Sequence, residues 1–385
     1  MKVVEAISDS GIGGAGVLLL TRLAQSDRTR FSYHVLVPRG SALAERLRKI
    51  EGVTVWELNC RGERSFSWGA LVRSIRILRY LSPDLVNCHG SLACRVAAWL
   101  CRVSCRIYTR HCAYEPKAWQ TVFPWKWLIG KVQTVLSHKV IAVAEAAKQN
   151  LCDVGVPPDR IEVIVNGVEG LRAVDEEDRK KVRQIYGIPD KAPVVSICAR
   201  LEWCKDHQTF LRTAERLLAR SERYHFLVIG TGSLDKSLRD ECVRRGIASH
   251  VHFTGFVRDV APLFSITKVN VNCSVGTETS SLALSEGMSL GIPALVSDYG
   301  GNPYMVRDGE NGFVFAQRDD KRLTELIEQV ISDENLYARL SVGAYRRFRD
   351  ELNAKKMTKE TEELYEKLLC FFCEVTKCRA GRWQC

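Results

Sequence analysis

The chain has 385 residues, 46% of them hydrophobic, and a formal net charge of +11. This length and composition allow a large buried core that is most simply divided between two domains. No run approaches the roughly 18 apolar residues of a membrane span, and the chain starts directly on a predicted strand, Lys2 to Ile7, so we expect no membrane-spanning helix and no signal peptide.

The 15 cysteines are scattered through predicted strands and helices. In a long chain without an export signal we expect reduced, mostly buried thiols rather than a disulfide framework. Four cysteines crowd at the C-terminal end. Only one CxxC motif occurs among them, with no second CxxC motif to pair with it, so we predict no metal site there. These four are Cys370, Cys373, Cys378 and Cys385.

The positive charge belongs to the first half of the chain. Residues 1–170 hold 23 Lys and Arg against 14 Asp and Glu, a net +9, whereas residues 171–385 hold 33 against 31, a net +2. A basic half of this kind suggests nucleic acid, an anionic membrane surface or an anionic acceptor as its partner.

Strand and helix patterns alternate through the first half, which is typical of a parallel β-sheet. A glycine-rich loop, SDSGIGGAG from Ser8 to Gly16, falls between the first strand and the first helix. Such a loop is either a simple tight connection or a place where the backbone approaches a ligand closely. The predicted strands are Lys2–Ile7, Phe31–Val37, Val53–Glu57 and Asp84–Cys88.

Two histidines follow strand-like segments, His89 in VNCHGS and His111 in IYTRHCAYE. Each lies at the predicted carboxyl end of its strand, where α/β sheets bind their ligands. Isolated histidines are more often structural or merely exposed than catalytic. The residues alone therefore leave both readings open.

Aromatic and basic residues are interleaved between Lys117 and Lys139. This mixture is typical of a segment at a membrane interface, although a helix packing its aromatic rings on the sheet is an alternative. Stacking on single-stranded nucleic acid uses the same residue types, but no nucleic-acid-binding module surrounds the segment. The aromatic residues are Trp119, Phe123, Trp125 and Trp127, and the nearby lysines are Lys117, Lys126 and Lys131.

The second half opens after a linker predicted between Ile161 and Pro193. Arg200 and Lys205 come just after the predicted strand Val194 to Cys198. A diphosphate leaving group needs its charge neutralised by a metal or by such cations, although both residues could be ordinary surface charges. The chain lacks a metal-holding DxD motif, so Arg200 and Lys205 are the better candidates.

The stretch from Ser274 to Gly301, SVGTETSSLALSEGMSLGIPALVSDYGG, holds two carboxylates, Glu278 and Glu286. Ser280 or Ser281 is a good N-cap for a helix over residues 282–290, which places Glu278 in the preceding loop and Glu286 on the second turn. The helix N-terminus favours an anion, and ionised carboxylates accept hydrogen bonds from hydroxyl groups. A nucleotide-sugar fits this combination, whereas the alternative is a pair of solvated charges.

This stretch resembles the E-x7-E region of the retaining glycosyltransferases of family 4, which have the GT-B fold. The likeness continues through SLGIPALVSDYGG and NGFVF, and VIVNGVEG resembles the segment at the domain junction of that family. The family pattern Gly-Arg-x4-Lys-Gly is altered here, with Ala199 and Asp206 at the glycine positions. Tyr304 stands where the family commonly has the glutamate of a Pro-Glu pair.

The resemblance implies an α/β protein in which two Rossmann-like parallel-sheet domains face each other across a cleft. Residues 1–168 would form the acceptor-side domain, and residues 169–365 would form the nucleotide-sugar-binding domain. Residues 366–385 would be the end of a C-terminal helix and a tail, crossing back to the first domain.

The implied function is transfer of a hexose, with retention and without a metal or other cofactor, from a nucleotide diphosphate-sugar. We expect a UDP-sugar donor and a lipid-linked or cell-surface polysaccharide acceptor, handled by a cytoplasmic protein on the inner face of the plasma membrane. The expected partners are the nucleotide-sugar, the glycan acceptor and an anionic membrane surface, not nucleic acid. Alternatives are a non-catalytic nucleotide-sugar-binding partner of another transferase, or a scaffold using the basic first half.

The resemblance also implies roles for individual residues. His111, Glu278, Arg200 and Lys205 would be catalytic, with His89 as a second candidate for the histidine. Family members carry a glycine-rich loop near the donor diphosphate and cradle the nucleobase with a segment equivalent to FTGFV. The donor-binding residues would be Gly13, Gly14, Gly230, Gly255, Phe256, Val257, Thr279, Ser280, Ser281, Leu282 and Glu286.

Overall fold

The computed structural model describes residues 1–58, 65–112 and 116–379, with side chains up to residue 372. The chain divides into two compact units. Unit 1 contains Met1–Gly167 together with the segment that begins at Ala354, and unit 2 contains Val168–Asn353. The predicted division differs over residues 354–365, which belong to unit 1 because one continuous helix starts at Ala354 and packs within that unit.

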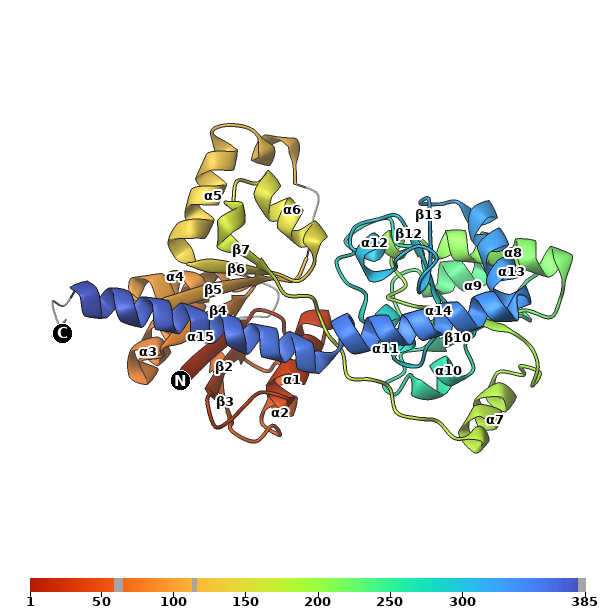
Figure 1. Ribbon diagram of the computed structural model, residues 1–385, viewed down its shortest axis with the longest axis horizontal. Helices are drawn as coiled ribbons and strands as arrows, with labels where there is room; N and C mark the ends of the chain where they lie inside the picture. Colours follow the sequence, from red (N-terminus) through yellow and green to blue (C-terminus); the bar gives the residue numbers. More distant parts are fainter. Residues whose placement is uncertain (59–64, 113–115, 380–385) are drawn as a thin grey trace. The chain divides into compact units, whose positions relative to one another are not determined.

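Unit 1 contains a parallel sheet whose strand order in the described residues is β3-β2-β1-β4-β5-β6-β7 (Figure 1). Nearly every position of the central strands is buried, which explains why most of their residues are apolar. The strands are β1 Lys2–Ile7, β2 Ser32–Pro38, β3 Val53–Leu58, β4 Leu85–His89, β5 Cys105–Arg110, β6 Lys139–Ala142 and β7 Ile161–Val163.

Helices connect these strands, and the C-terminal helix α15 packs against α1 and β5 of the same unit. Tyr365 of α15 is fully buried there. The predicted return of the C-terminal helix to the first domain therefore matches the structure. The helices are α1 Gly14–Ala24, α2 Ala42–Leu47, α3 Trp68–Leu81, α4 Leu92–Leu100, α5 Trp125–Leu136, α6 Glu145–Asp153 and α15 Ala354–Arg379, and two 3-10 turns span Ala118–Thr121 and Pro158–Arg160.

Unit 2 has a second parallel sheet, of order β10-β9-β8-β11-β12-β13. Its strands are β8 Val194–Cys198, β9 His225–Ile229, β10 Val251–Gly255, β11 Val269–Asn272, β12 Ala294–Ser297 and β13 Gly312–Phe315. Its helices are α7 Glu176–Ile185, α8 His207–Arg220, α9 Asp235–Arg244, α10 Ala261–Ser265, α11 Leu282–Ser289, α12 Asn302–Met305, α13 Asp320–Ser332 and α14 Glu334–Arg347, with a 3-10 turn at Trp203–Lys205 and a π-helical turn at Phe348–Leu352.

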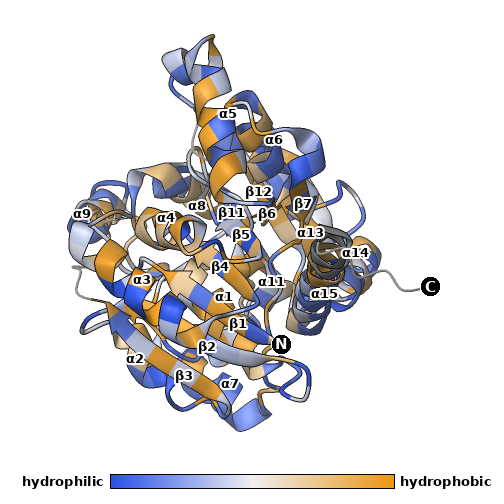
Figure 2. Cartoon of the chain, turned by 90° about the vertical axis from the view of Figure 1, so that its left-hand side faces the viewer, coloured by the Kyte–Doolittle hydropathy of each residue, from blue (hydrophilic) through white to orange (hydrophobic). Residues whose placement is uncertain are grey.

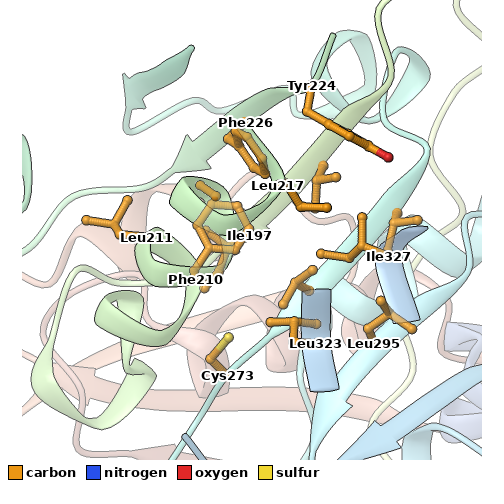
Figure 3. Packing of buried hydrophobic residues seen from close by; sticks show 14 of the residues in the cluster. Ile197, Phe210, Leu211, Leu217, Tyr224, Phe226, Cys273, Leu295, Leu323 and Ile327 are labelled. Carbon is orange, nitrogen blue, oxygen red and sulfur yellow. The ribbon is translucent and has the colours of Figure 1, made fainter. Parts of the chain in front are cut away.

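The largest core of unit 2 lies where α8 and α13 cover the sheet. Figure 3 shows Phe210 and Leu217 of α8 and Leu323 and Ile327 of α13 close to strand residues such as Phe226. The rings of Phe210 and Phe226 meet edge to face, with centroids 5.8 Å apart. This geometry suits the ring quadrupoles and fixes α8 on the sheet.

The strand orders locate the ligand-binding edge of each unit. Chain order reverses between β1 and β4 in unit 1 and between β8 and β11 in unit 2. The loops that leave the carboxyl ends of such neighbouring strands diverge, and the crevice between them is where open α/β sheets bind ligands. In unit 1 a ligand site is therefore expected among the loops after β1 and β4, and in unit 2 among the loops after β8 and β11.

The aromatic segment predicted between Lys117 and Lys139 includes α5, which is mostly uncovered. Of its residues only Gly130 and Leu136 are buried, so the alternative of a helix packing its aromatic rings on the sheet is wrong. In Figure 2, α5 carries a mixture of hydrophobic and hydrophilic residues. The exposed hydrophobic residues, at 41–82% of full exposure, are Trp119, Val122, Phe123, Trp125, Trp127, Leu128, Val132 and Val135.

Within residues 1–58, 65–112 and 116–379, no helix is both long enough and apolar enough to cross a membrane. The same residues contain no group of three or more His, Cys, Asp or Glu side chains arranged to hold a metal ion. Eleven cysteines have described side chains, and all eleven are free thiols. Cys385 of the predicted C-terminal cluster lies outside the described residues.

Replacing Phe210 with Ala should destabilise unit 2 by about 3–5 kcal/mol, because it removes a fully buried ring and leaves a cavity beside Phe226. Urea unfolding followed by circular dichroism measures this loss. Phe371→Ala, at a ring that is 57% exposed, is the matched control and should cost under about 1 kcal/mol. Equal losses in both variants would contradict the packing described here.

Candidate functional site

Two loops of unit 2 bring Lys205 and Glu278 together at the β8/β11 crevice. Lys205 Nζ donates a hydrogen bond to Glu278 Oε2 at 2.6 Å. Asn272 Nδ2 and Ser274 Oγ donate to the same oxygen, each at 3.0 Å. Sequence reasoning selected Lys205 and Glu278 separately, and the structure shows that they form an ion pair.

The environment of Glu278 keeps its carboxylate ionised. Burial alone would raise the pKa of Glu278, but the charge of Lys205 and the hydrogen bonds from Lys205, Asn272 and Ser274 outweigh burial and hold the pKa below its usual value. An ionised carboxylate can only accept hydrogen bonds. Glu278 therefore offers a fixed negative acceptor, held in place by three donors.

Glu286 lies on α11, and Glu278 lies in the loop before that helix, as predicted. Burial raises the pKa of Glu286 to about 7. The Cys198 thiol, at the end of β8, has its pKa raised to about 12 by burial and by the Glu286 carboxyl group. The environment of Glu286 thus favours its neutral form far more than the environment of Glu278 does.

The N-terminus of α11 is capped by Ser281, one of the two predicted candidates, whose Oγ accepts from the Leu284 N–H at 3.4 Å. Thr279 and Ser280 precede it and are almost fully buried. Leu282, the first residue of the helix, is partly buried. These four predicted donor-site residues therefore form one continuous turn between the two glutamates.

Gly300 and Gly301, which follow β12, pack against the backbone of the loop that carries Glu278. A Cβ atom on Gly300 would overlap the carbonyl oxygen of Glu278, and one on Gly301 would overlap that of Thr279. The Gly301 N–H donates to the Glu278 carbonyl oxygen at 3.2 Å. The double glycine is therefore needed for close backbone contact, which fixes the position of Glu278.

The two departures from the family glycines leave the loop after β8 intact. Asp206 takes up the left-handed conformation, with φ +44°, which Asp and Asn tolerate better than most residues do. Its side chain caps α8 by accepting from Thr209, so the aspartate gains a role that glycine lacks. Ala199 has no left-handed backbone conformation and fits without strain. Arg200 between them is exposed.

The remaining predicted donor-site residues lie after β9 and β10. A Cβ on Gly230 would overlap the carbonyl oxygen of Ala199, and the Gly230 N–H donates to Gly255 O at 3.0 Å. Gly230 thus allows close packing of the loops, whereas Gly255 has open space around it and is favoured by its left-handed backbone, with φ +71°. Phe256 is 77% exposed, whereas Val257 packs against a hydrophobic cluster of unit 2.

The contacts of Tyr304 explain why a tyrosine stands at this position. Its hydroxyl donates to Glu351 Oε2 at 3.4 Å, and the Arg347 guanidinium lies 4.7 Å from the centre of its ring while donating to its carbonyl oxygen. Tyr304 therefore links α12 to the end of α14 and the π-helical turn that follows. The neighbouring Asn302 turns its amide towards Ser297 and Asn272 instead.

In unit 1, the glycine-rich loop lies at the β1/β4 crevice, and α1 begins at Gly14 with Gly13 as its N-cap. Neither glycine has a left-handed conformation, and a Cβ on either would meet no atom closer than 3.9 Å. Packing within the chain thus does not explain these glycines. Close approach of a ligand to the α1 amides would explain them.

His89 and His111 meet beside this loop. His89 Nδ1 lies 2.7 Å from His111 Nε2, and the two rings stack with centroids 5.0 Å apart. His89 Nε2 lies 2.8 Å from Glu5 Oε2. Burial, His89 and Arg22 together lower the pKa of His111 well below its usual value, so its ring is neutral.

Sequence reasoning missed Glu5, which is completely buried in β1. Its carboxylate pairs with Arg22 of α1 and accepts from the Tyr365 hydroxyl at 2.9 Å. Burial raises the pKa of Glu5, but Arg22 and the hydrogen bonds from His89 and Tyr365 outweigh it and hold the pKa below its usual value. The available signal was a lone charge inside the apolar strand KVVEAI.

Sequence reasoning also missed Trp203, in the 3-10 turn between Arg200 and Lys205. Its indole is 68% exposed, and its ring lies 3.1 Å from where a Cβ on Gly276 would be. Trp203 thus stands over the loop that carries Glu278. A small, mostly apolar cavity of about 30 Å³ in unit 1 has Asn87, His89, Thr109 and His111 among its lining residues.

When the chain is compared with known proteins, each half matches a family model of glycosyltransferases. Residues 12–169 match the model described as Glycosyltransferase Family 4, and residues 178–347 match the model described as Glycosyl transferases group 1. Together the two models span residues 12–347 apart from 170–177.

Individual relatives have low sequence identity to this chain. EpsD of Bacillus subtilis is 26% identical over 268 residues, which cover 67% of this chain and 70% of EpsD. The Escherichia coli UDP-Gal:alpha-D-GlcNAc-diphosphoundecaprenol alpha-1,3-galactosyltransferase is 23% identical over 309 residues, covering 77% of this chain and 78% of that protein. The crystal structure of Anabaena Alr3699/HepE with UDP-glucose superposes with a TM-score of 0.82 at 19% identity, covering 95% of this chain and all of that one.

The two parallel-sheet units, the likeness of fold and the two family models agree with the predicted class. The chain belongs to the glycosyltransferases of family 4 and has the GT-B class of fold.

Proposed function

We propose that this glycosyltransferase moves a sugar, with retention and without a metal, from a UDP-sugar to a lipid-linked or surface-polysaccharide acceptor. The observation that carries the proposal is the ion pair between the partly buried Lys205 and the buried Glu278 at the β8/β11 crevice. UDP is favoured because the Anabaena neighbour binds UDP and UDP-glucose, and because the E. coli relative is named for a UDP-Gal donor.

In this proposal unit 2 holds the donor. Glu278, ionised and acceptor-only, takes hydroxyl groups of the sugar, and Glu286 takes the ribose hydroxyls. Arg200 and Lys205 neutralise the diphosphate, together with the amides at the start of α11. Lys205 is held by Glu278 before any ligand arrives, so little side-chain ordering is left to be done on binding.

The same charges support bond cleavage. As the bond between the sugar and the diphosphate breaks, negative charge grows on the departing phosphate, and Arg200 and Lys205 stabilise it without a metal. The departing phosphate oxygen can take the proton of the incoming hydroxyl on the same face of the sugar, which retains the configuration. Glu278 is a poor base for this proton because its low pKa and its three donors keep it ionised and engaged. Unit 1 would supply the acceptor site, the glycine-rich loop and His111.

The uncovered α5 segment supports an acceptor at an anionic membrane surface, which we propose to be on the cytoplasmic side. Residues 116–144 contain four lysines and no acidic residue, and the exposed aromatic side chains lie among them. Lysines attract anionic headgroups while the rings enter the interface. Gly130 of α5 sits so close to Gly155 that a Cβ would overlap its carbonyl oxygen, which anchors the helix on unit 1.

UDP should stabilise the protein against heat in the presence of EDTA. At about 100 times its dissociation constant a ligand adds roughly 2.7 kcal/mol of stability, which a thermal-shift assay detects easily. Arg200→Ala should abolish most of this shift, whereas Lys321→Ala, at an exposed cation on α13, should keep it. Comparing the thermal shifts with UDP, GDP and ADP shows which nucleobase the site prefers. A shift that requires a divalent metal, or no shift with any nucleotide, would contradict the proposed donor site.

UDP-glucose affinity should rise with pH because Glu286, with a pKa of about 7, must lose its proton to accept ribose hydroxyls. Below that pKa we expect about a tenfold weaker affinity per pH unit, since only the ionised fraction binds. Calorimetric titration between pH 5.5 and 8.5 measures this. UDP-glucose is preferred to UDP because it lacks a terminal phosphate that titrates nearby. Glu286→Gln should bind weakly and lose the pH dependence; an unchanged profile would refute the assignment.

The protein should bind vesicles containing anionic lipid more tightly than vesicles of phosphatidylcholine, and salt should weaken this binding. Replacing both Phe123 and Trp127 with Ser should reduce binding at least tenfold, because each buried ring is worth about 1.5–3 kcal/mol. Trp68→Ser removes a ring that is 74% exposed on α3 and serves as the control. Equal binding by both variants in a flotation assay would exclude α5 as the contact.

A further inference from the structure

Unit 2 has a second hollow, which shares no lining residue with the loops that carry Lys205 and Glu278. It is a cavity of about 680 Å³, here called the α14 groove, between α14 and the loop that runs from α12 to the start of β13 at Gly312. That loop ends at the amino end of its strand, whereas the loops of Lys205 and Glu278 follow the carboxyl ends of theirs. The walls of the groove include Arg307 and Glu310 of the loop and Arg339, Val342, Gly343 and Arg346 of α14.

The loop wall of the groove is held in place by contacts within unit 2. The buried Asn311 side chain accepts from the Arg307 N–H at 2.8 Å and donates to the Met305 carbonyl oxygen at 3.1 Å. A Cβ atom on Gly343 would overlap the carbonyl oxygen of Glu310, so this glycine lets α14 contact the loop backbone directly. The groove is therefore formed before any ligand arrives, as most small-molecule sites are.

The carboxylates at the end of α14 already have cationic partners. Glu351 accepts from Arg307 at 2.8 Å and also pairs with Arg347. Both oxygens of Asp350 accept from Arg349, at 2.7 and 3.0 Å. These carboxylates are thus neutralised by arginines other than Arg339 and Arg346.

Arg339 and Arg346 are the unpaired charges of the groove. Within residues 1–58, 65–112 and 116–379, neither side chain has a hydrogen bond or an ion pair. They lie seven positions apart on α14, which is about 10 Å along the helix axis and about 20° around it. Val342, which is 60% exposed, lies between them. The third carboxylate of the lining, Glu310, approaches Arg307 instead, at 3.8 Å.

Two unpaired guanidinium groups on one side of a helix favour an anion with two charged ends. A guanidinium binds a phosphate through two parallel N–H···O bonds, which are stronger than bonds from neutral donors. The volume of the groove lies in the range of small-molecule sites. A lipid surface fits less well, because Val342 is the only large hydrophobic side chain exposed in the lining, whereas α5 exposes several aromatic rings.

We propose that the α14 groove is a site for a soluble molecule that carries two phosphoryl groups, which Arg339 and Arg346 bind. The site is separate from the crevice of Lys205 and Glu278, so the inference goes beyond the proposed function and does not rest on it.

Inorganic pyrophosphate is the probe, titrated by calorimetry into the full-length protein with EDTA at physiological salt. Replacing both Arg339 and Arg346 with Ala should weaken the affinity at least tenfold, because the charge-assisted hydrogen bonds are lost. Both side chains are exposed, so the double variant should fold normally. The matched control replaces Arg73 and Arg76, two exposed arginines of α3, with Ala and should bind pyrophosphate as the native protein does.

Two further variants test whether the site is specific. Val342→Glu keeps both cations but places a carboxylate within reach of Arg346 at i+4 and Arg339 at i−3, so it should also weaken binding at least tenfold. Replacing both arginines with Lys keeps the charge but removes the bidentate geometry, so its affinity should lie between those of the native protein and the alanine variant. Native affinity in the lysine variant would show that general charge attraction holds the anion, which overturns the inference.

Arg200→Ala separates the groove from the proposed donor crevice, which pyrophosphate can also enter. In this background the loss caused by removing Arg339 and Arg346 should persist. If Arg200→Ala abolishes all binding while the alanine variant of the groove binds normally, the anion occupies only the crevice and the inference is wrong. It is also wrong if the native protein binds no pyrophosphate.

A vesicle assay distinguishes a soluble ligand from a lipid headgroup. Vesicles containing anionic lipid should bind the native protein and the alanine variant of Arg339 and Arg346 equally. Weaker binding by the variant would mean that the groove contacts a lipid surface, against the proposal. If UDP causes no thermal shift in the native protein, the proposed function fails but the α14 groove is unaffected.

Discussion

The buried carboxylate of Glu278 is the constraint on which the β8/β11 edge of unit 2 depends. An ionised group out of water is costly unless donors surround it, and Lys205, Asn272 and Ser274 supply them from two different loops. Gly300 and Gly301, in the loop after β12, hold the Glu278 loop in place by allowing direct backbone contact with Glu278 and Thr279. The Glu278 charge, the loops around it and the glycine pair therefore depend on one another at the end of the sheet.

Unit 1 also buries an ionised glutamate, Glu5, but other kinds of side chain stabilise it. Glu5 is buried in the middle of a strand rather than in a loop, and a guanidinium, a phenol and an imidazole satisfy it. Both units thus place an ionised glutamate next to the point where their strand order reverses. Low dielectric strengthens each of these contacts, so both edges are rigid where a ligand would bind.

The parts of the structure that depend on local pattern could be predicted from the sequence. Alternating strands and helices gave the sheets, and the N-cap at Ser281 correctly separated Glu278 from Glu286. What could not be predicted depends on contacts between distant residues. Glu5 meets residues 17, 84 and 360 positions away, so its strand alone gives no sign of its partners. The predicted boundary at residue 365 cut α15 for the same reason, because tertiary contacts decide to which unit a helix belongs.

The return of α15 to unit 1 also bears on the order in which the chain is made. Glu5 leaves the ribosome before unit 2 is made, whereas Tyr365 follows only after all of unit 2, residues 168–353, has been synthesised. Unit 2 can therefore fold as a complete domain while unit 1 still waits for its last helix. During that interval the charged pocket around Glu5 is open on one side, and unit 1 closes it last, although its synthesis began first.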